Sequence, residues 1–404
     1  EIGKGWNGLD SGSFYSIMVY IGHLPDVLRC MRTCKNWSKN GQKPRIWAEM
    51  CDRLGWPPLG RTWFLQKFRD IKLFSRPGVI ENTFEVGQPV MKLYCPTQIQ
   101  LYSWRYGRKT AVNRNLITVA QTSSPLQVWD VGTKWCRTQH CTETENEDED
   151  AKTEAKRGTT IPWTAVAISD SKVLFAESKT CNIVARDLSR SKNYTLGRHA
   201  STVTCLEMNS AGTLAVSGGY DKAVRVWDLK QLTQKCKFDV GSRMWAVGVH
   251  PDAPRVAAGT DDAIYVMNTE NGKILTKIFP PKNETIMTVK FDPAQPDSFL
   301  FAGGYDKELR LWNYITGQCV QVFKGHTGVV FDCLPMANVL ISCSRDKTTR
   351  IYDRHTGECV QELKGHDMDV KCCTYLKPDR IVTGGFDLKF NIWSFPSRTE
   401  NGEV

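Results

Sequence analysis

A pattern of short strands and turns that recurs along the chain constrains its fold more than any other feature. The segment Thr202–Lys230, TVTCLEMNSAGTLAVSGGYDKAVRVWDLK, contains three short alternating apolar runs, VTCLEM, LAVSG and AVRVWD. Residues typical of turns (Asn, Gly and Asp) separate the runs. Alternation over four to six residues between such turns predicts half-buried antiparallel strands.

The end of this segment identifies the repeat. A pair of residues, an aromatic or similar one followed by a polar one, starts at positions 129, 186, 227, 267, 312, 352 and 393. The last five pairs are 40 to 45 residues apart. A strand meander of this length that ends in Trp-Asp is typical of a propeller blade. From about Glu81 to the end, the chain resembles WD-repeat proteins. The resemblance implies a mainly β fold, a seven-bladed WD-repeat β-propeller.

Four positions recur in the same order in three of the repeats. The sets are His199, Ser217, Asp221 and Trp227; His326, Ser342, Asp346 and Tyr352; and His366, Thr383, Asp387 and Trp393. The resemblance implies one hydrogen-bonded chain through each blade, because a buried carboxylate persists only when it is paired. A catalytic Ser-His-Asp triad is the alternative, but it occurs once and needs an exposed nucleophile. We therefore expect a scaffold element and no enzyme. The fifth repeat has Ala302 for the hydroxyl and lacks the Gly-His, which predicts a looser blade.

The first 80 residues predict helices instead of strands. Apolar stripes at helical spacing precede LPDVLRCMRTCKNW, Leu24–Trp37, which Arg45-Ile46-Trp47 follows. This order resembles an F-box, although its usual Leu-Pro-x-Glu opening is absent; a generic helical cap on the propeller is the alternative. We expect an F-box-like helical module at 1–54, a helical linker at 55–80 and the propeller at 81–404. An acidic insertion at 143–157 is expected to be disordered, and the strand near Thr83 to pair with the last blade.

F-box and WD repeats together resemble the substrate-recognition subunits of SCF-type ubiquitin ligases. The resemblance implies a Skp-type adaptor and a cullin-RING core as partners, and a protein substrate on the propeller face. The expected adaptor contacts are apolar residues in the first two helices and just before them: Leu9, Phe14, Ile17, Leu24, Pro25, Val27 and Leu28. Two alternatives remain. Ala215–Lys230 also resembles the segment by which other WD-repeat receptors bind a different cullin adaptor, and the chain could be a scaffold without ligase activity.

Two positions in each repeat are expected to line the substrate face. The residue before the turn Asp and an early residue of the innermost strand should point to one end of the channel. These residues are Tyr220, Tyr305, Arg345 and Phe386 at the first position, and Trp245, Phe331 and Lys371 at the second. Arg345 and Lys371 match positions that bind phosphorylated degrons in some F-box propellers. The substrate motif is therefore expected to be phosphorylated or acidic, or to mix aromatic and acidic residues.

Composition limits the remaining function classes. The net charge of +10 is spread along the chain without a long basic run, so nucleic acid is not an expected partner. The chain has no run of 18 apolar residues and no secretory signal pattern, so no membrane partner is expected. Its 15 cysteines form no zinc or redox spacing, which predicts no metal, no cofactor, and a cytoplasmic or nuclear location.

Overall fold

The described part of the chain consists almost entirely of strands. The computed structural model describes residues 73–395, with gaps at 75–76, 87–89, 91, 95–98, 104–107, 113–115, 121–125, 131–134, 140–162, 170–171, 188–191, 210, 282–283 and 378. Contacts divide the chain into two units, Glu1–Lys72 and Leu73–Val404, and every described residue belongs to the second unit. The expected helical module at 1–54 and the acidic insertion at 143–157 therefore lie outside the described residues.

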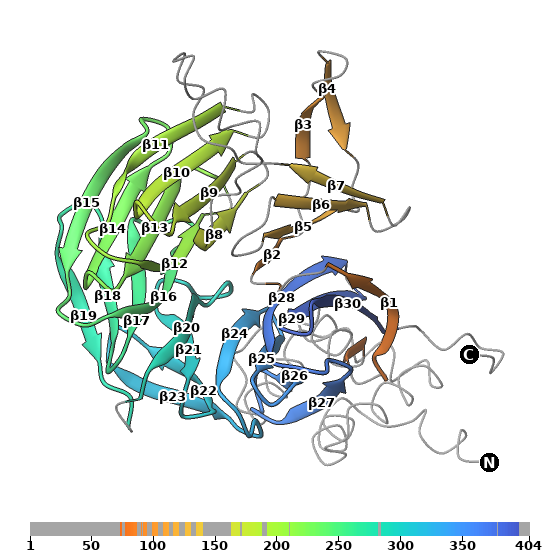
Figure 1. Ribbon diagram of the computed structural model, residues 1–404. Helices are drawn as coiled ribbons and strands as arrows, with labels where there is room; N and C mark the ends of the chain where they lie inside the picture. The colour runs from red at the N-terminus through yellow and green to blue at the C-terminus, as the bar shows by residue number, and fades with distance from the viewer. Residues whose placement is uncertain are drawn as a thin grey trace, which may run out of the picture. The chain divides into compact units, whose positions relative to one another are not determined.

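The described strands form seven four-stranded sheets and one two-stranded sheet (Figure 1). Each four-stranded sheet is called a blade here, numbered along the chain. Blade 1 contains β2 (Lys92–Tyr94), β5 (Leu116–Ala120), β6 (Leu126–Asp130) and β7 (Trp135–Gln139). Blade 2 contains β8 (Trp163–Ile168), β9 (Lys172–Glu177), β10 (Asn182–Asp187) and β11 (Lys192–Arg198). Blade 3 contains β12 (Val203–Met208), β13 (Leu214–Gly219), β14 (Ala223–Asp228) and β15 (Thr233–Asp239).

The remaining blades continue in the same order. Blade 4 contains β16 (Met244–Val249), β17 (Arg255–Thr260), β18 (Ile264–Asn268) and β19 (Ile274–Ile278). Blade 5 contains β20 (Ile286–Phe291), β21 (Phe299–Gly304), β22 (Leu309–Asn313) and β23 (Gln318–Phe323). Blade 6 contains β24 (Val330–Pro335), β25 (Val339–Ser344), β26 (Thr348–Asp353) and β27 (Cys359–Lys364). Blade 7 combines β28 (Val370–Lys377), β29 (Arg380–Gly385) and β30 (Lys389–Ser394) with β1 (Val79–Glu85).

The polar stretch between the first strands of blade 1 forms the two-stranded sheet. It is an antiparallel hairpin of β3 (Ile99–Ser103) and β4 (Arg108–Val112). The hairpin lies between β2 and β5, which pair with each other directly. It is therefore an insertion into the blade and not one of its four strands.

Blade 7 joins the two ends of the β region. β1 pairs antiparallel with β30, with Thr83 opposite Asn391, and Phe84 stacks on Phe390 with ring centroids 4.7 Å apart. The innermost strands of blades 2 to 7 lie side by side in sequence order, and β2 lies beside both β28 and β8. These neighbours form a closed cycle of innermost strands, as the blades of a propeller do. The arrangement is consistent with a WD-repeat propeller, and pairing of the Thr83 strand with the last blade is confirmed.

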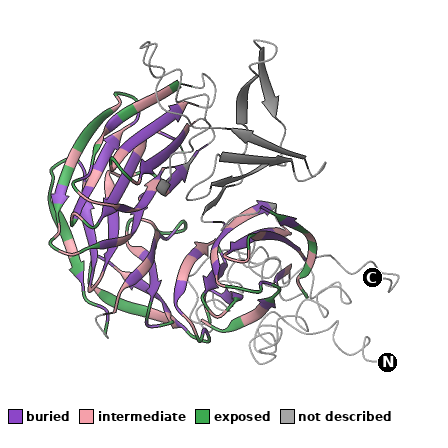
Figure 2. Cartoon of the chain, viewed as in Figure 1, coloured by how far each residue is buried: buried purple, intermediate pink, exposed green. Residues whose placement is uncertain are grey.

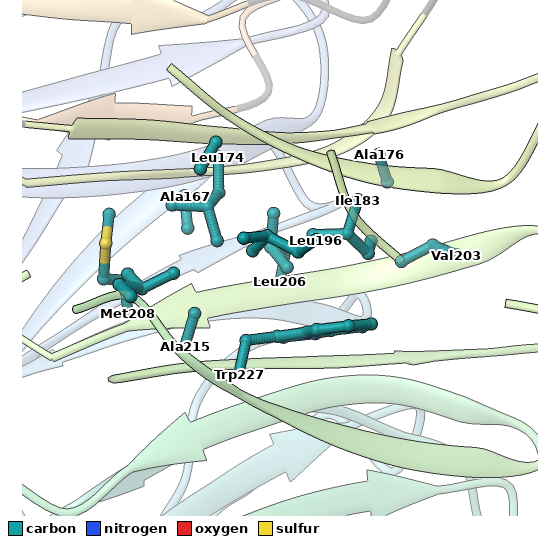
Figure 3. Close-up of a cluster of buried hydrophobic side chains, with 12 residues drawn as sticks. Ala167, Leu174, Ala176, Ile183, Leu196, Val203, Leu206, Met208, Ala215 and Trp227 are labelled. Atoms are coloured by element: carbon teal, nitrogen blue, oxygen red, sulfur yellow. The ribbon is translucent and has the colours of Figure 1, made fainter. Parts of the chain in front are cut away.

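The core lies between neighbouring blades. In blades 2 to 7 the middle strands are nearly all buried, whereas the outermost strands are more exposed, as blade 3 illustrates (Figure 2). Between blades 2 and 3, the indole of Trp227 is buried in an apolar cluster that includes Ile183, Leu206 and Met208 (Figure 3). Apolar burial of this kind is the main stabilising contribution to such a stack of sheets. The first described residues join it, because Phe74 packs edge-on against Phe395 with centroids 5.0 Å apart.

Candidate protein-interaction site

Blade 3 contains one continuous chain of polar side chains. The indole Nε1–H of Trp227 donates to Ser217 Oγ over 2.8 Å, and Ser217 Oγ lies 2.7 Å from His199 Nε2. On the other side of the ring, His199 Nδ1 lies 2.9 Å from Asp221 Oδ2. Because the carboxylate can only accept, Nδ1 is assigned as the protonated nitrogen, and Ser217 then donates to Nε2. In this assignment the hydrogen bonds connect all four side chains, from Trp227 through Ser217 and His199 to Asp221.

The same chain is present in blades 6 and 7. His326 lies 2.7 Å from Asp346 and 2.6 Å from Ser342. His366 lies 2.8 Å from both Asp387 and Thr383, and the Thr383 hydroxyl accepts from Trp393 Nε1 over 2.8 Å. Tyr352 takes the place of the Trp in blade 6; burial raises the pKa of its phenol, which also hydrogen-bonds to Ser342.

These chains do not have the geometry of a catalytic triad. The side chains of Ser217, Ser342 and Thr383 are fully buried, so their oxygens are not accessible to a substrate. Each turn aspartate also accepts a hydrogen bond from the backbone N–H that follows the His, as Asp346 does from Thr327 at 3.0 Å. The carboxylate therefore ties the loop before the innermost strand to the turn after the second strand. This is a structural function, repeated once in each of the three blades.

The electrostatics of the chains agree with this structural function. Burial alone would raise the pKa of Asp346, but hydrogen bonds from His326 and Thr348 outweigh it, and the pKa lies below its ordinary value. The pKa values of Asp221 and Asp387 are lowered in the same way. Burial lowers the pKa of His199 even though Asp221 opposes the change. The aspartates are therefore charged and His199 is neutral at neutral pH.

Blade 5 holds its turn aspartate with a different partner. Asp306 forms a buried ion pair with Arg310, whose other Nη atom lies 2.5 Å from Glu308. Arg310 lies on β22, two residues before Trp312, where blade 3 has Arg225. In blade 3 the guanidinium of Arg225 lies 3.7 Å from Asp221, because His199 already occupies that carboxylate. Arg310 thus replaces the missing His as the partner of Asp306.

The innermost strands direct a set of side chains to the end of the blade where these turns lie. In β12, β16, β20, β24 and β28 the second residue of the strand has no partner in the pairing with the next strand of the blade. Such an unpaired residue is the signature of a β-bulge. The skipped residues are Thr204, Trp245, Met287, Phe331 and Lys371. A bulge re-aims the side chain of the unpaired residue. The three residues expected on the substrate face from the innermost strands, Trp245, Phe331 and Lys371, are all at bulges.

The residues before the turn aspartates lie beside these bulged strands. The backbone N–H of Tyr220 donates to Thr202 O over 2.9 Å, and the N–H of Phe386 donates to Asp369 O over 2.9 Å. Gly219 is required at this approach, because a Cβ there would lie 2.3 Å from Thr202 O. Two positions far apart in each repeat are therefore brought next to one another.

A first cluster spans blades 3 and 4. The rings of Tyr220 and Trp245 meet edge-to-face with centroids 5.5 Å apart. Trp245 Nε1 donates to Asp261 over 2.7 Å, and Arg243 Nε donates to the same carboxylate over 3.0 Å. The Arg243 guanidinium also lies 5.9 Å from the Tyr220 ring centre. The charges of this cluster are paired internally, and Tyr220 is partly exposed, so the cluster offers an aromatic surface.

A second cluster spans blades 6 and 7. Lys371 Nζ lies 3.5 Å from the ring centre of Phe331 and 5.1 Å from that of Phe386. Burial lowers the pKa of Lys371 to about 8, with Asp369 acting in the opposite direction. Arg345 is largely exposed, and its Nε lies 3.9 Å from Asp369. This cluster combines two cations and one carboxylate with two aromatic rings.

Three contributors to this surface were missed by the sequence analysis. Arg243 and Asp261 complete the first cluster, and Asp369 lies beside Arg345 in the second. Asp261 is the residue of blade 4 that is equivalent to Tyr220 of blade 3. The turn of blade 4 is one residue shorter, so this equivalence is not visible in the sequence. Tyr305 belongs to neither cluster and is half exposed.

The expected adaptor-binding residues, Leu9, Phe14, Ile17, Leu24, Pro25, Val27 and Leu28, lie outside the described residues. No group of three or more potential metal ligands occurs among the residues that the structure describes. Within the same residues, no helix has the length and apolar character needed to cross a membrane.

Comparison with known proteins supports the repeat. Residues 190–228, 317–353 and 357–394 match the family model "WD domain, G-beta repeat". These segments contain the three sets of hydrogen-bonded side chains in blades 3, 6 and 7. The polypeptide therefore carries WD repeats.

Two curated relatives extend the comparison. The chain is 27% identical over 218 residues, 54% of its length, to "Transcription factor unc-37" of Caenorhabditis elegans. It is 26% identical over 133 residues, 33% of its length, to "Cilia- and flagella-associated protein 52" of Chlamydomonas reinhardtii. The matches span only 32% and 21% of the lengths of these relatives, and neither is named as a ubiquitin-ligase subunit.

Proposed function

We propose that this chain is a non-catalytic scaffold that captures a protein partner at the bulge-and-turn end of its blades. WD repeats imply protein interaction, and the two clusters indicate where it takes place. The single observation that carries the proposal is the second cluster, in which Lys371 is held between Phe331 and Phe386 next to the exposed Arg345. Aromatic and Arg side chains held rigidly in place are the usual composition of an interaction hot spot.

The chemistry of the two clusters defines the partner. Tyr220 and Trp245 offer an aromatic surface whose neighbouring charges are already paired, which suits an apolar or aromatic side chain. Asp369 lies 3.9 Å from Arg345 and also acts electrostatically on Lys371, so one carboxylate faces two cations and leaves an excess positive charge for a carboxylate or a phosphate. The partner segment would therefore carry an apolar anchor and an anionic group.

Charge reversal tests this function. The double variant Arg345→Glu and Lys371→Glu should lose the partner, because both cations then become repulsive. The matched control is Lys237→Glu with Lys364→Glu, which makes the same change in net charge on the outer strands β15 and β27. Proteins captured from cells by the wild type, the face variant and the control would be compared by mass spectrometry. An identical set of proteins for the wild type and the face variant would place binding elsewhere.

A second candidate function is substrate recognition in an SCF-type ubiquitin ligase. The observation that favours it is the F-box resemblance of Leu24–Trp37. In this case Leu24→Asp with Leu28→Asp should abolish binding of a Skp-type adaptor and leave partner capture at the propeller intact. Adaptor co-purification of this variant at the wild-type level would exclude Leu24–Trp37 as the adaptor-binding segment and leave the scaffold proposal standing. The likeness to a transcription factor supports a nuclear location, which cell fractionation would test.

A further inference from the structure

The outermost strands of blades 2 and 3 carry three exposed lysines without ion-pair partners. These strands, β11 and β15, lie side by side (Figure 1). Lys192 is the first residue of β11, Lys230 lies in the turn before β15, and Lys235 lies in β15. None of the three ammonium groups forms an ion pair with another residue that the structure describes. Lys192, Lys230 and Lys235 are called the rim lysines here.

The carboxylates next to the rim lysines do not neutralise them. Asp228 Oδ1 accepts hydrogen bonds from the backbone N–H groups of Lys230 and Gln231, over 2.8 and 2.9 Å. The bond from Gln231 and then that from Lys230 lower the pKa of Asp228, and the nearby charges of Lys235 and Lys230 lower it further. Two ammonium groups therefore lie near one carboxylate that already binds the turn. In the register Lys192 lies opposite Asp187, but no ion pair joins their side chains.

The outermost strands of blades 6 and 7 are different. Lys364 of β27 lies 3.0 Å from Glu362, and Glu81 of β1 lies 2.7 Å from Arg380. In both blades, a charged residue of the outermost strand is paired within its own sheet. The rim lysines of blades 2 and 3 instead leave an excess of positive charge on neighbouring strands.

The chain itself contains a segment of complementary charge. Glu143–Asp150, ETENEDED, has six carboxylates and no cation. It follows β7, the outermost strand of blade 1, which ends at Gln139. Blade 1 is the neighbour of blade 2, because β2 lies beside β8.

The length of chain after β7 is sufficient to reach the rim lysines. An extended chain spans about 3.3 Å per residue, so Asp150 can lie up to about 35 Å from Gln139. Sheets that pack face to face are about 10 Å apart. Blade 3 is two sheets away from blade 1 and is therefore within this reach.

We propose that the rim lysines bind the acidic segment Glu143–Asp150 of the same chain. Attraction between several exposed opposite charges requires no single conformation of the segment, and the covalent connection gives the segment a high effective concentration at the rim. An anionic partner from outside would have to displace it. The interaction does not depend on the proposed function, because the two clusters come from the innermost strands and the turns beside them.

Zero-length cross-linking of the full chain tests the proposal. A carbodiimide joins a lysine amine to a carboxyl group in direct contact, and mass spectrometry identifies the joined peptides. At low ionic strength residues 143–150 should be joined to the rim lysines. The yield should fall severalfold in about 1 M salt, where the Debye length is about 3 Å. A mixture of isotope-labelled and unlabelled protein separates links within one copy, which support the proposal, from links between copies. Absence of links to the rim lysines, or links only between copies, would overturn it.

Proteolysis provides a second readout, based on charge reversal. A Glu-specific protease should cleave the segment about tenfold faster in Lys192→Glu, Lys230→Glu, Lys235→Glu than in the wild type, because several weak surface ion pairs are lost together. The matched control is Lys273→Glu, Lys324→Glu, Lys347→Glu, which reverses three exposed lysines outside blades 2 and 3. It should be cleaved at the wild-type rate. A rim variant cleaved no faster than the wild type, or a control accelerated as much as the rim variant, would overturn the proposal.

Discussion

Blades 3 and 5 hold the same turn aspartate by two different chemistries. In blade 3, Asp221 is bound by a buried neutral His199, which is in turn connected through Ser217 to Trp227. In blade 5, the hydroxyl is replaced by Ala302, and Asp306 is bound by the guanidinium of Arg310 from the neighbouring strand. The blade therefore requires a partner for the aspartate, and the complete chain of four residues is one of two ways to supply it.

The difference has an energetic consequence. A neutral His-Asp contact places one formal charge in the blade, whereas the pair of Asp306 and Arg310 places two opposite charges in a buried site. Removing Asp306 leaves the buried Arg310 guanidinium with only Glu308 as its partner, whereas removing Asp221 leaves a neutral imidazole without its acceptor. A buried charge that loses a partner costs more than a neutral group that loses one. The blade without the His should thus be the more sensitive of the two to loss of its aspartate.

The largest effect is therefore expected for Asp306→Ala. It should lower the free energy of unfolding by about 3–5 kcal/mol, the usual cost of breaking a buried pair from one side. Replacing both members, as in Asp306→Ala with Arg310→Met, should recover part of the loss because the buried guanidinium is then removed as well. Denaturant unfolding of the single and double variants measures both effects. A double variant no more stable than the single one would show that Arg310 is not left unpaired.

A smaller effect is expected for Ser217→Ala. Without the hydroxyl, Trp227 Nε1 loses its acceptor and His199 Nε2 loses its donor, and each buried unsatisfied group costs about 1–3 kcal/mol. The matched variant Ala302→Ser adds a hydroxyl to blade 5, where no His is present to use it. It should therefore change the stability by less than Ser217→Ala. Thermal unfolding of the two variants side by side would decide this; equal destabilisation would mean that the serine acts through packing alone.

The sequence predicts blade 3 better than blade 5 for a physical reason. Four polar and aromatic residues in the same order produce a pattern that recurs at His326 and His366, so its members can be found without a structure. The pair of Asp306 and Arg310 occurs once among the described blades, and an arginine at that place in a strand is also what blade 3 has at Arg225. Only the structure shows which guanidinium reaches the aspartate.

The same reasoning applies to the interaction surface. The bulged residues Trp245, Phe331 and Lys371 could be selected from the repeat, because a bulge recurs at one place in the innermost strands of blades 2 to 7. Their partners come from neighbouring blades, as Tyr220 does for Trp245, and contacts between blades leave no local periodic signal. The shortened turn of blade 4 further hid Asp261. Repetition in the sequence therefore predicts which residues lie on the interaction surface. Long-range packing between blades decides which of these residues contact one another.

The smallest effect expected from the comparison is a change in pH dependence. His199 has a pKa lowered by burial, so the unfolded chain binds its proton more readily than the folded chain does. Its contribution to stability is fully present above the unfolded value near pH 6.5 and is lost as the pH falls through the folded value. The wild type should therefore lose stability as the pH falls below about 6.5, and His199→Gln should lose less over the same range, because glutamine does not titrate.

Blade 5 contains no His bound to its turn aspartate, so Asp306→Asn should leave this part of the pH profile unchanged. Melting temperatures of the three proteins between neutral and mildly acidic pH measure the difference. Parallel profiles for the wild type and His199→Gln would show that the imidazole of blade 3 keeps an ordinary pKa in the folded protein.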